Sequence, residues 1–412
     1  MNVEEIQRFL AEKQNGFHRN LKQPRRKDRN SKHLDGWLMY DFRGSNPIAR
    51  SVAGIDDPGI TRRWFCYIPS EGTPIWLVHR IEVSHFADVL GEVRTYTDWG
   101  ELHREMGILL ARSHRVAMEY SPFAAIPYVS RVDAGTVECI RSLGVEVVSS
   151  ADLVQLSEAR WTDDQFAGHR ESAHLIMKIK DEAFEWLSRQ LRDEAPVTEY
   201  DVQSLIMERF DAMDLTPGHP PIVAVNAKAS DPHYYPTADQ HQSIQPGDFV
   251  LIDLWAKGKS PDAVYADTTW IAYAGETAPQ RYIEVFKVVR DARDLAVTFI
   301  RKKFAAGKVV HGYAVDDVVR NYIAEKGYGD FFIHRTGHSI GTEIHGNGVN
   351  IDNLETKDER ALIPGACFSI EPGIYLPEFG VRSEIDVFIA DLTPEGVVVT
   401  TLPVQEEVLM LL

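Results

Sequence analysis

Two segments in the second half of the chain place acidic residues at matching positions. Each segment begins with a Pro-Gly pair and continues into an apolar stretch, with one acid six positions after the glycine and a second acid thirteen or fourteen positions further on. The segments are PGDFVLID, from Pro246, and PGACFSIE, from Pro364, and the four acids are Asp253, Asp267, Glu371 and Glu384. Burying unpaired carboxylates costs several kcal/mol unless cations compensate them. Four acids in register therefore favour a cation-binding site over a solvated face of the protein.

Three histidines lie between the two acidic segments, in the stretch FFIHRTGHSIGTEIHGNG. They are His334, His338 and His345, and they fall within twelve residues. Neutral imidazole is the commonest nitrogen ligand of metals and the usual acid or base near neutral pH. A single histidine here would more often be structural. Three histidines beside four carboxylates predict a site that combines metal binding with proton transfer.

The same stretch contains the pattern G-x-S-x-G, which marks the nucleophilic serine of α/β-hydrolases. The serine is Ser339, in Gly337-His338-Ser339-Ile340-Gly341. In that fold the catalytic histidine follows the serine and the acid along the chain, yet the last histidine of this chain is His345, six residues after Ser339. The match is therefore interpreted as coincidental. No HExxH, P-loop or G-x-G-x-x-G pattern is present either.

The acids need strands to position them. The repeated pattern of turn, apolar stretch and acid predicts a domain of two related halves, in which each half delivers a pair of carboxylates from adjacent strands. Upstream of that domain, residues 37–154 alternate short β-branched or aromatic runs with helical patches, which is typical of an α/β domain. From about residue 163 the chain changes to long amphipathic helices, one of which opens with Thr198 and Asp201 at capping-box spacing. We place the domain boundary near residues 155–162, which predicts an N-terminal domain of residues 1–158 and a C-terminal domain of residues 159–412.

Composition narrows the class of protein. The 412 residues include 44 lysines and arginines against 61 acids, a net charge of −17, so the chain should repel nucleic-acid phosphates. The basic run from Gln23 to His33 is interpreted as a solvated surface segment, because few aromatic residues interleave with its charges. Cys66, Cys139 and Cys367 are too few and too scattered for a disulfide framework. With no apolar stretch long enough to span a membrane, the sequence predicts a soluble, cytoplasmic protein.

The order Asp-Asp-His-Glu-Glu resembles the five metal ligands of the pita-bread metallopeptidases, which include prolidase (Xaa-Pro dipeptidase), aminopeptidase P and methionine aminopeptidase. The most specific stretches are HRTGHSIG, SIEPGIY and GVRSE, and the resemblance covers the chain from about residue 160 to the end. It implies an α+β domain with pseudo-twofold halves around a curved antiparallel sheet. The N-terminal domain is similar to the extra domain of prolidase, aminopeptidase P and creatinase. Creatinase shares the fold but lacks the metal ligands, and here all five positions are filled.

The resemblance also implies how the ligands divide between two divalent cations. Asp267 and Glu384 would bridge the two ions, Asp253 would chelate the first, and His338 and Glu371 would complete the second. An oxygen-rich site of this kind favours Mn²⁺, although Co²⁺ or Zn²⁺ could occupy it. Two such ions would lower the pKa of a shared water, and the hydroxide would attack a peptide carbonyl with Glu371 as the proton shuttle.

Four further residues receive roles from the resemblance. His345 and His233 would stabilise the tetrahedral oxyanion or the leaving amine, and His334 would line the substrate pocket. Arg382 could meet the C-terminus of a substrate or orient the carboxylates, and an ion pair behind the metal ligands is an equal alternative. His219 and His241 receive no role.

The chain departs from the family pattern at three places. The two aspartates stand fourteen residues apart, which is longer than usual in the family, so KGKSPDA looks like an insertion beside the pocket. Trp270 replaces an arginine in a D-x-T-R pattern, and Gly346 replaces an acid after the last histidine. We expect all three differences to alter the pocket and to leave the metal ligands unchanged.

The leading hypothesis is a dinuclear metallopeptidase that cleaves Xaa-Pro bonds in dipeptides or short peptides with proline at the second position. One alternative is a non-peptidase enzyme on the same fold, either a creatinase-like C–N hydrolase or a lyase acting on a small metabolite. Another is a catalytically inactive binding protein. The resemblance implies a homodimer; no nucleic-acid or membrane partner is expected.

Overall fold

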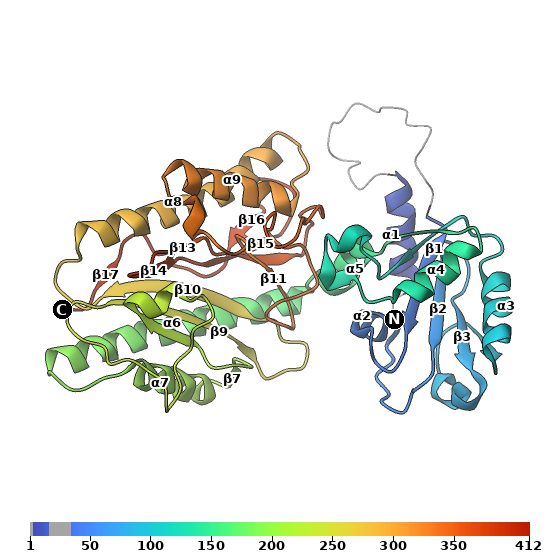
Figure 1. Cartoon of the computed structure of the whole chain (residues 1–412), viewed down its shortest axis with the longest axis horizontal. Coiled ribbons are helices and arrows are strands. Elements are labelled where there is room, and N and C mark those ends of the chain that lie inside the picture. The colour runs from blue at the N-terminus through green and yellow to red at the C-terminus, as the bar shows by residue number, and fades with distance from the viewer. Residues whose placement is uncertain (1–2, 16–33) are drawn as a thin grey trace. The chain divides into compact units, whose positions relative to one another are not determined.

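A computed structural model describes residues 3–15 and 34–412 of the chain (Figure 1). The basic run from Gln23 to His33 lies outside these residues. The chain divides into two compact units, Met1–Glu158 and Ala159–Leu412, called here the N-terminal and C-terminal units. None of the described helices combines the length and the apolar character needed to cross a membrane.

The N-terminal unit is built on a six-stranded mixed sheet with the strand order β4-β3-β2-β1-β5-β6. Its strands are β1 (Gly36–Asp41), β2 (Trp64–Pro69), β3 (Ile75–His79), β4 (Glu92–Tyr96), β5 (Arg115–Met118) and β6 (Glu146–Ser149). Its helices are α1 (Val3–Asn15), α2 (Pro47–Ala53), α3 (Trp99–Leu109), α4 (Ala134–Ser142) and α5 (Ala151–Glu158). Strands β1, β2 and β3 pair antiparallel, while β4, β5 and β6 join parallel. The predicted α/β character of this region is confirmed.

The two faces of this sheet carry different helices. Helices α1, α2 and α5 pack together with β1 and β2, whereas α3 and α4 share one apolar cluster with side chains of β1 and β2 that point the other way. Alternation along β1 explains the division, because Leu38 and Tyr40 join the α3 and α4 cluster while Trp37 and Met39 point to the opposite face.

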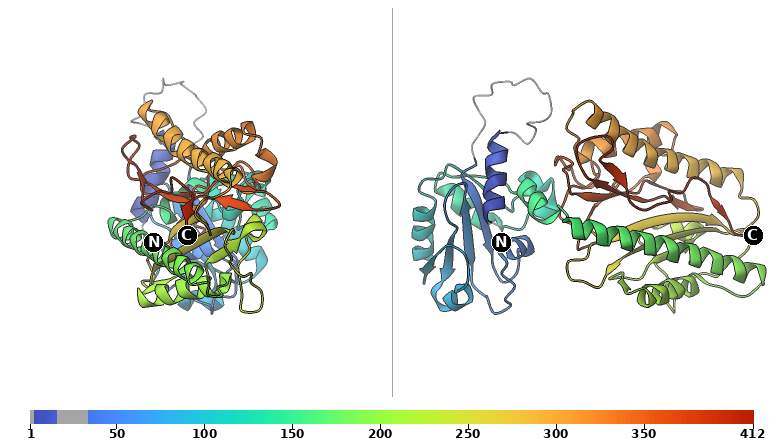
Figure 2. Two further views of the ribbon diagram at one scale, coloured as in Figure 1. Left: turned by 90° about the vertical axis from the view of Figure 1, so that its left-hand side faces the viewer. Right: turned by 180° about the vertical axis from the view of Figure 1, so that it is seen from behind.

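The C-terminal unit places its strands between two pairs of helices (Figures 1 and 2). The helices are α6 (Asp163–Arg192), α7 (Glu199–Ala212), α8 (Gln280–Ala305) and α9 (Gly312–Glu325). The strands are β7 (Leu215–Thr216), β8 (Ile222–Val225), β9 (Phe249–Gly258), β10 (Ala266–Tyr273), β11 (Ser339–Ile340), β12 (Cys367–Ile370), β13 (Gly373–Tyr375), β14 (Gly380–Arg382), β15 (Ile385–Ile389), β16 (Val397–Val399) and β17 (Leu409–Met410). The pairing is antiparallel except between β10 and β17, which run parallel.

The start of α7 confirms the capping box expected from the sequence. The Thr198 hydroxyl accepts from the Asp201 backbone N–H at 3.1 Å, and the Asp201 carboxylate accepts in return from the Thr198 backbone N–H at 2.9 Å. Helix α6 begins in the same way, with Thr162 and Gln165 as the reciprocal pair. These caps satisfy backbone donors that the first turn of a helix otherwise leaves free.

Two antiparallel strand pairs carry the four acids. In the first pair, β9 and β10, Asp253 stands opposite Thr269 and Asp267 stands opposite Trp255. In the second pair, β12 and β15, Ile370 stands opposite Ile385, so Glu371 directly follows one strand and Glu384 directly precedes its neighbour. Each half therefore delivers its two acids from adjacent strands, as the repeated sequence pattern predicts.

Trp270 points away from the acids. On β10 the side chains of Asp267 and Thr269 share one face, while Trp270 lies on the other face and packs in the cluster covered by α6 and α7. The Lys180 ammonium of α6 lies 3.5 Å from the centroid of the indole ring. The expectation that Trp270 would alter the pocket is therefore wrong, because an odd separation of three residues from Asp267 places it on the opposite side of the strand.

Candidate metal centre

The five residues named from the sequence order converge inside the C-terminal unit. Asp253 comes from the middle of β9, Asp267 from the start of β10, and His338 from the segment just before β11, while Glu371 and Glu384 flank β12 and β15. All except Glu371 are buried, and the Glu371 side chain is 15% exposed. One ligand atom each from Asp267, His338 and Glu384 fits within 4.8 Å of the others. That separation suits side chains that share a cation.

The imidazole of His338 presents a free nitrogen to the acids. Its Nδ1 lies 3.2 Å from the Ser339 carbonyl oxygen, which can only accept a hydrogen bond, so Nδ1 carries the proton. Its Nε2 lies 3.4 Å from Glu371 Oε1 and 3.7 Å from Asp267 Oδ2. A carbonyl that fixes the tautomer in this way directs the lone pair of Nε2 at the place where a metal would sit.

Three carboxylate oxygens in this cluster are buried without a hydrogen-bond donor from any described residue. They are Asp253 Oδ1, Asp267 Oδ1 and Glu384 Oε1. The second oxygen of two of these groups is held in place, since Arg382 Nη2 donates to Asp253 Oδ2 at 2.5 Å and the Thr269 hydroxyl donates to Glu384 Oε2 at 2.8 Å. Buried polar atoms normally find partners, so three unpartnered oxygens beside one imidazole nitrogen fit divalent cations.

The electrostatics of the cluster agree with this interpretation. Burial, reinforced by the neighbouring acids, raises the pKa of Asp267 and of Glu384 well above the ordinary values of these side chains. Burial also raises the pKa of Glu371 to about 7, although the Arg382 charge acts in the opposite direction. Acids gathered in a dry site resist ionisation together, and a bound cation reverses that balance.

The loop and strand neighbours of the acids hold them in position. The Ser369 hydroxyl donates to Glu371 Oε1 at 3.2 Å and accepts from the His338 backbone N–H at 2.9 Å. Beneath the acids, Asp386 Oδ2 accepts from the Asp267 backbone N–H at 2.8 Å and joins the two halves. Sequence reasoning missed Ser369 and Asp386. Ser369 lies two positions before Glu371 and Asp386 lies two positions after Glu384, so in an extended chain each shares a side with a predicted ligand.

The Arg382 guanidinium is hydrogen-bonded to one of the acids and to two neighbouring hydroxyl groups. Besides Asp253, its guanidinium donates to the Thr269 hydroxyl at 3.2 Å and to the Tyr375 hydroxyl at 3.0 Å, and its Nε lies 4.0 Å from Glu371 Oε2. This geometry matches the orientation of carboxylates, one of the roles open from the sequence. A substrate carboxylate would have to compete with these three bonds.

His334 belongs to the same hydrogen-bond chain through Tyr375. The His334 Nδ1–H donates to the Arg335 carbonyl at 2.7 Å, so its Nε2 accepts from the Tyr375 hydroxyl at 2.6 Å. Burial, together with the Arg382 charge, lowers the pKa of His334 to about 3, which keeps the ring neutral. Sequence reasoning missed Tyr375, and its place in the specific stretch SIEPGIY was the available signal.

His345 and His233 are the remaining two histidines named from the sequence. The His345 ring meets that of His338 edge to face, with 4.5 Å between the ring centroids. Partial burial and the charges of Arg335 and His233 lower the pKa of His345 to about 4, which also places His233 within electrostatic reach. His233 itself is exposed. The exposed His345 imidazole therefore borders the metal-ligand cluster from the solvent side, with His233 acting on it electrostatically.

Ser339 has a structural environment. The side chain is buried, and its hydroxyl accepts from the Gly348 backbone N–H at 3.0 Å. The coincidental interpretation of the G-x-S-x-G pattern is thus confirmed. A Cβ on Gly346 would stand 3.0 Å from the Ser339 hydroxyl, so this loop has little room for the acid that the family pattern carries there.

The hairpin between β9 and β10 packs against the segment that follows His338. The Tyr265 backbone N–H donates to the Gly341 carbonyl at 2.9 Å, and Lys257 Nζ donates to the Thr342 carbonyl at 2.5 Å. The predicted insertion KGKSPDA therefore borders the loop between His338 and His345.

Comparison with known proteins agrees with this geometry. Residues 168–391, more than half of the chain, match the model of metallopeptidase family M24. A 165-residue segment is 36% identical to the Xaa-Pro dipeptidase of Lactobacillus helveticus and covers 40% of this chain and 40% of that protein. The matched segment thus represents well under half the length of this curated relative.

Two solved structures share the fold over nearly the whole chain. A dipeptidase from Mycobacterium ulcerans superposes with a TM-score of 0.68 at 20% identity, covering 100% of this chain and 99% of that one. A recombinant prolidase from Thermococcus sibiricus gives a TM-score of 0.59 at 21% identity, with the same coverage. The C-terminal unit has the expected pita-bread fold, and the chain belongs to metallopeptidase family M24, whose membership implies divalent metal ions.

Proposed function

We propose that this protein is a metal-dependent peptidase that hydrolyses Xaa-Pro bonds in dipeptides or short peptides. The observation that carries the proposal is the buried convergence of four carboxylates and one imidazole, with three carboxylate oxygens that no described residue satisfies. Membership of family M24 supports a peptidase. The Xaa-Pro dipeptidases among the relatives support proline at the second position of the substrate.

The proposed metal ligands are those expected from the sequence order: Asp253, Asp267, His338, Glu371 and Glu384. Carboxylate oxygens are hard donors and no thiolate contributes, so we propose two divalent cations with Mn²⁺ favoured and Co²⁺ or Zn²⁺ as substitutes. When bound, such ions lower the pKa of a shared water and make hydroxide available near neutral pH.

The protein's own groups would then handle protons and charge. We assign to Glu371 the transfer of the proton from water to the leaving amine, because its side chain is 15% exposed, against 10% for Asp253, 6% for Asp267 and 4% for His338. His345 and His233, both exposed, would stabilise the oxyanion or the leaving amine. His334 would present its ring to the substrate, since both of its nitrogens have partners.

Arg382 is proposed as a positioning residue. Its bond to Asp253 Oδ2 leaves Asp253 Oδ1 for a cation, and its charge offsets part of the acid cluster before metal binds. The homodimer and the cytoplasmic location remain predictions.

The test is hydrolysis of a matched substrate series. Purified full-length protein is assayed with Ala-Pro, with the tripeptide Ala-Pro-Ala and with the controls Ala-Ala and Pro-Ala, first with Mn²⁺ and then after removal of metal by a chelator. We expect cleavage of the Xaa-Pro bond in at least one proline substrate, loss of activity with chelator, and recovery when Mn²⁺ is returned. Stoichiometric metal with no cleavage of any proline substrate would overturn the proposal, and activity on small amides instead would support a C–N hydrolase.

A further inference from the structure

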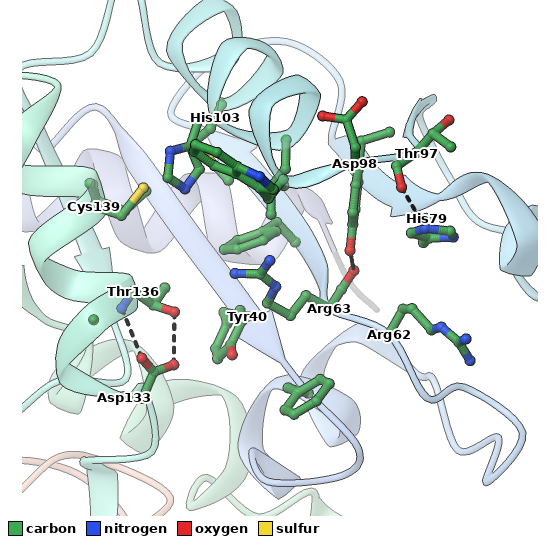
Figure 3. Close-up of a pocket in the computed structure, with 18 residues that line it drawn as sticks. Tyr40, Arg62, Arg63, His79, Thr97, Asp98, His103, Asp133, Thr136 and Cys139 are labelled. Atoms are coloured by element: carbon green, nitrogen blue, oxygen red, sulfur yellow. Dashed lines mark hydrogen bonds between the residues drawn. The ribbon is translucent and has the colours of Figure 1, made fainter.

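A second candidate site lies in the N-terminal unit, at residues remote in sequence from the metal ligands. A cavity of about 740 Å³ opens between the sheet and the helices α3 and α4 (Figure 3). Strands β1 to β4 and both helices contribute side chains to it, and every lining residue falls between Tyr40 and Ile140. Its volume lies within the range of small-molecule sites, about 300–1,000 Å³.

Five aromatic side chains line the cavity: Tyr40, Phe42, Phe65, Tyr96 and Trp99. Tyr40 and Phe65 form a tilted pair with 5.0 Å between ring centroids, and Trp99 and His103 meet edge to face at 5.6 Å. Trp99 is 72% exposed, although a tryptophan on a helix that packs against a sheet would ordinarily be buried. Flat rings with an accessible indole favour a ligand that has a flat apolar body.

Arg63 brings a positive charge into this apolar space. Its guanidinium points into the cavity between Tyr40 and His103 (Figure 3). Arg62 also lines the cavity, but its guanidinium donates to the Thr61 hydroxyl at 2.6 Å and lies 3.9 Å from Glu82. The Tyr96 hydroxyl donates to the Arg63 backbone carbonyl at 2.7 Å. This bond holds the backbone of Arg63 in place just before strand β2. Among the described residues, no carboxylate forms an ion pair with the Arg63 guanidinium.

The two acids that line the cavity, Asp98 and Asp133, cap the N-termini of α3 and α4. Asp98 caps α3 by accepting from the Glu101 backbone N–H at 2.9 Å. Asp133 caps α4 and accepts from the Thr136 backbone N–H at 2.8 Å and from the Thr136 hydroxyl at 2.7 Å. Carboxylates that cap helices have donors of their own, so the Arg63 charge remains available to a ligand.

His79, the lining histidine that lies on a strand, also has hydrogen-bond partners of its own. His79 Nε2 donates to the Thr97 carbonyl at 3.0 Å, and its Nδ1 accepts from the Ile81 backbone N–H at 3.3 Å. Both nitrogens of that ring are therefore occupied. Arg63 is left as the strongest donor that faces the cavity.

We propose that this cavity binds a small organic anion with a flat apolar body, such as an aromatic carboxylate. The Arg63 guanidinium meets the carboxylate with paired N–H donors, and the rings of Tyr40 and Trp99 cover the body of the ligand. This site shares no residue with the metal centre. Its occupancy is independent of whether the protein hydrolyses peptides.

The proposal is tested by calorimetric titration of the full-length, metal-loaded protein with 3-phenylpropionate and with its neutral analogue 3-phenylpropionamide. We expect saturable binding of the acid at one site per chain, with the amide at least about tenfold weaker because it lacks the charge that Arg63 recognises. The variant Arg63→Gln should weaken binding of the acid by at least about tenfold. The control variant Arg104→Gln, which removes an exposed arginine from α3 outside the cavity, should bind as the parent does.

Three results would overturn the proposal: no saturable binding of the acid, equal affinity for the amide, or binding that survives in Arg63→Gln. The last result would place the probe elsewhere, for example at the metal centre. Trp99→Ala keeps the test decisive if Arg63→Gln fails to fold, because an exposed side chain contributes little to stability. We expect a loss of about fivefold in affinity from that variant, and unchanged affinity would rule out the aromatic wall as part of the site.

Discussion

Arg382 Nη2 donates to Asp253 Oδ2 at 2.5 Å, and both side chains are buried inside the C-terminal unit. This pair joins β9 in one half of the unit to β14 in the other. It also places a fixed cation beside acids that would otherwise face only one another. The stability of the metal-free protein should therefore depend on this arginine.

Replacing Arg382 with Gln should lower the free energy of unfolding of the metal-free protein by about 3–5 kcal/mol, because a buried carboxylate loses its partner. Saturating Mn²⁺ should recover part of that loss, since a bound cation neutralises Asp253. The measurement is urea unfolding with and without metal. Arg281→Gln is the matched control, because Arg281 forms an exposed pair with Glu378 at 3.4 Å and should change stability by less than about 1 kcal/mol. Equal losses in the two variants would contradict the assignment of Arg382.

Thr269→Val should weaken metal binding and preserve the fold. The Thr269 hydroxyl donates to Glu384 Oε2 at 2.8 Å, and valine keeps the shape of the side chain while removing that donor. Loss of a group that orients a metal ligand typically reduces metal affinity by about 10–100-fold. Competition with a chelator measures the affinity for Mn²⁺.

The neighbouring substitution Thr268→Val provides the control for that experiment. The Thr268 hydroxyl donates to the Glu384 backbone carbonyl at 3.2 Å and not to the carboxylate. Its effect on metal affinity should stay within about threefold, a limit set by the modest net value of a neutral hydrogen bond. If both variants lose affinity equally, orientation of the carboxylate is not the cause.

Glu371→Gln should reduce kcat by about 10²–10⁴-fold on the best Xaa-Pro substrate, because the amide cannot carry a proton from water to the leaving amine. The substitution keeps side-chain volume and an oxygen that can accept from Ser369. Circular dichroism should therefore match that of the parent. Glu378→Gln, at an exposed position, serves as the control and should retain full activity. A metal-loaded Glu371→Gln protein with kcat within tenfold of the parent would refute the proton-transfer role.

The protein should lose stability in mild acid because His169 is buried in its neutral form. Burial lowers the pKa of His169 to about 4, below its ordinary value of 6.5, and its Nδ1–H donates to the Tyr265 carbonyl at 2.7 Å. Its Nε2 accepts from the Thr400 hydroxyl at 2.6 Å, and Asp386 lies 3.9 Å away. The unfolded chain takes up the proton first, so the stabilising contribution is complete above pH 6.5 and is lost as the pH falls through 4.

The expected loss from His169 between pH 6.5 and 4 is about 3 kcal/mol, at 1.36 kcal/mol for each pKa unit. Urea unfolding of the parent and of His169→Asn across this range measures it. Asparagine retains an N–H donor for the Tyr265 carbonyl and has no proton to gain, so the variant should show a flatter dependence on pH. An exposed histidine, replaced in His219→Asn, should leave the dependence unchanged. Parallel curves for the parent and His169→Asn would contradict this account.

Local pattern predicted several elements of the fold. The short apolar runs expected within residues 37–154 include strands β1 and β2, and the amphipathic stretch after Thr198 is helix α7. These predictions succeeded because alternation and capping depend on neighbours within a few residues. Alternation along β10 likewise places Trp270 on the face opposite to Asp267.

The sequence by itself determined which side chains could form the metal centre. Two copies of one pattern, each a Pro-Gly turn followed by an apolar strand and spaced acids, predict carboxylates on or directly beside paired strands. Only the tertiary structure decided what those side chains touch. The Arg382 bonds to Asp253 and Tyr375, the placement of Asp386 beneath Asp267 and the cavity around Arg63 all join segments remote in sequence or on different elements. Such contacts depend on how layers pack, and no local periodicity encodes that.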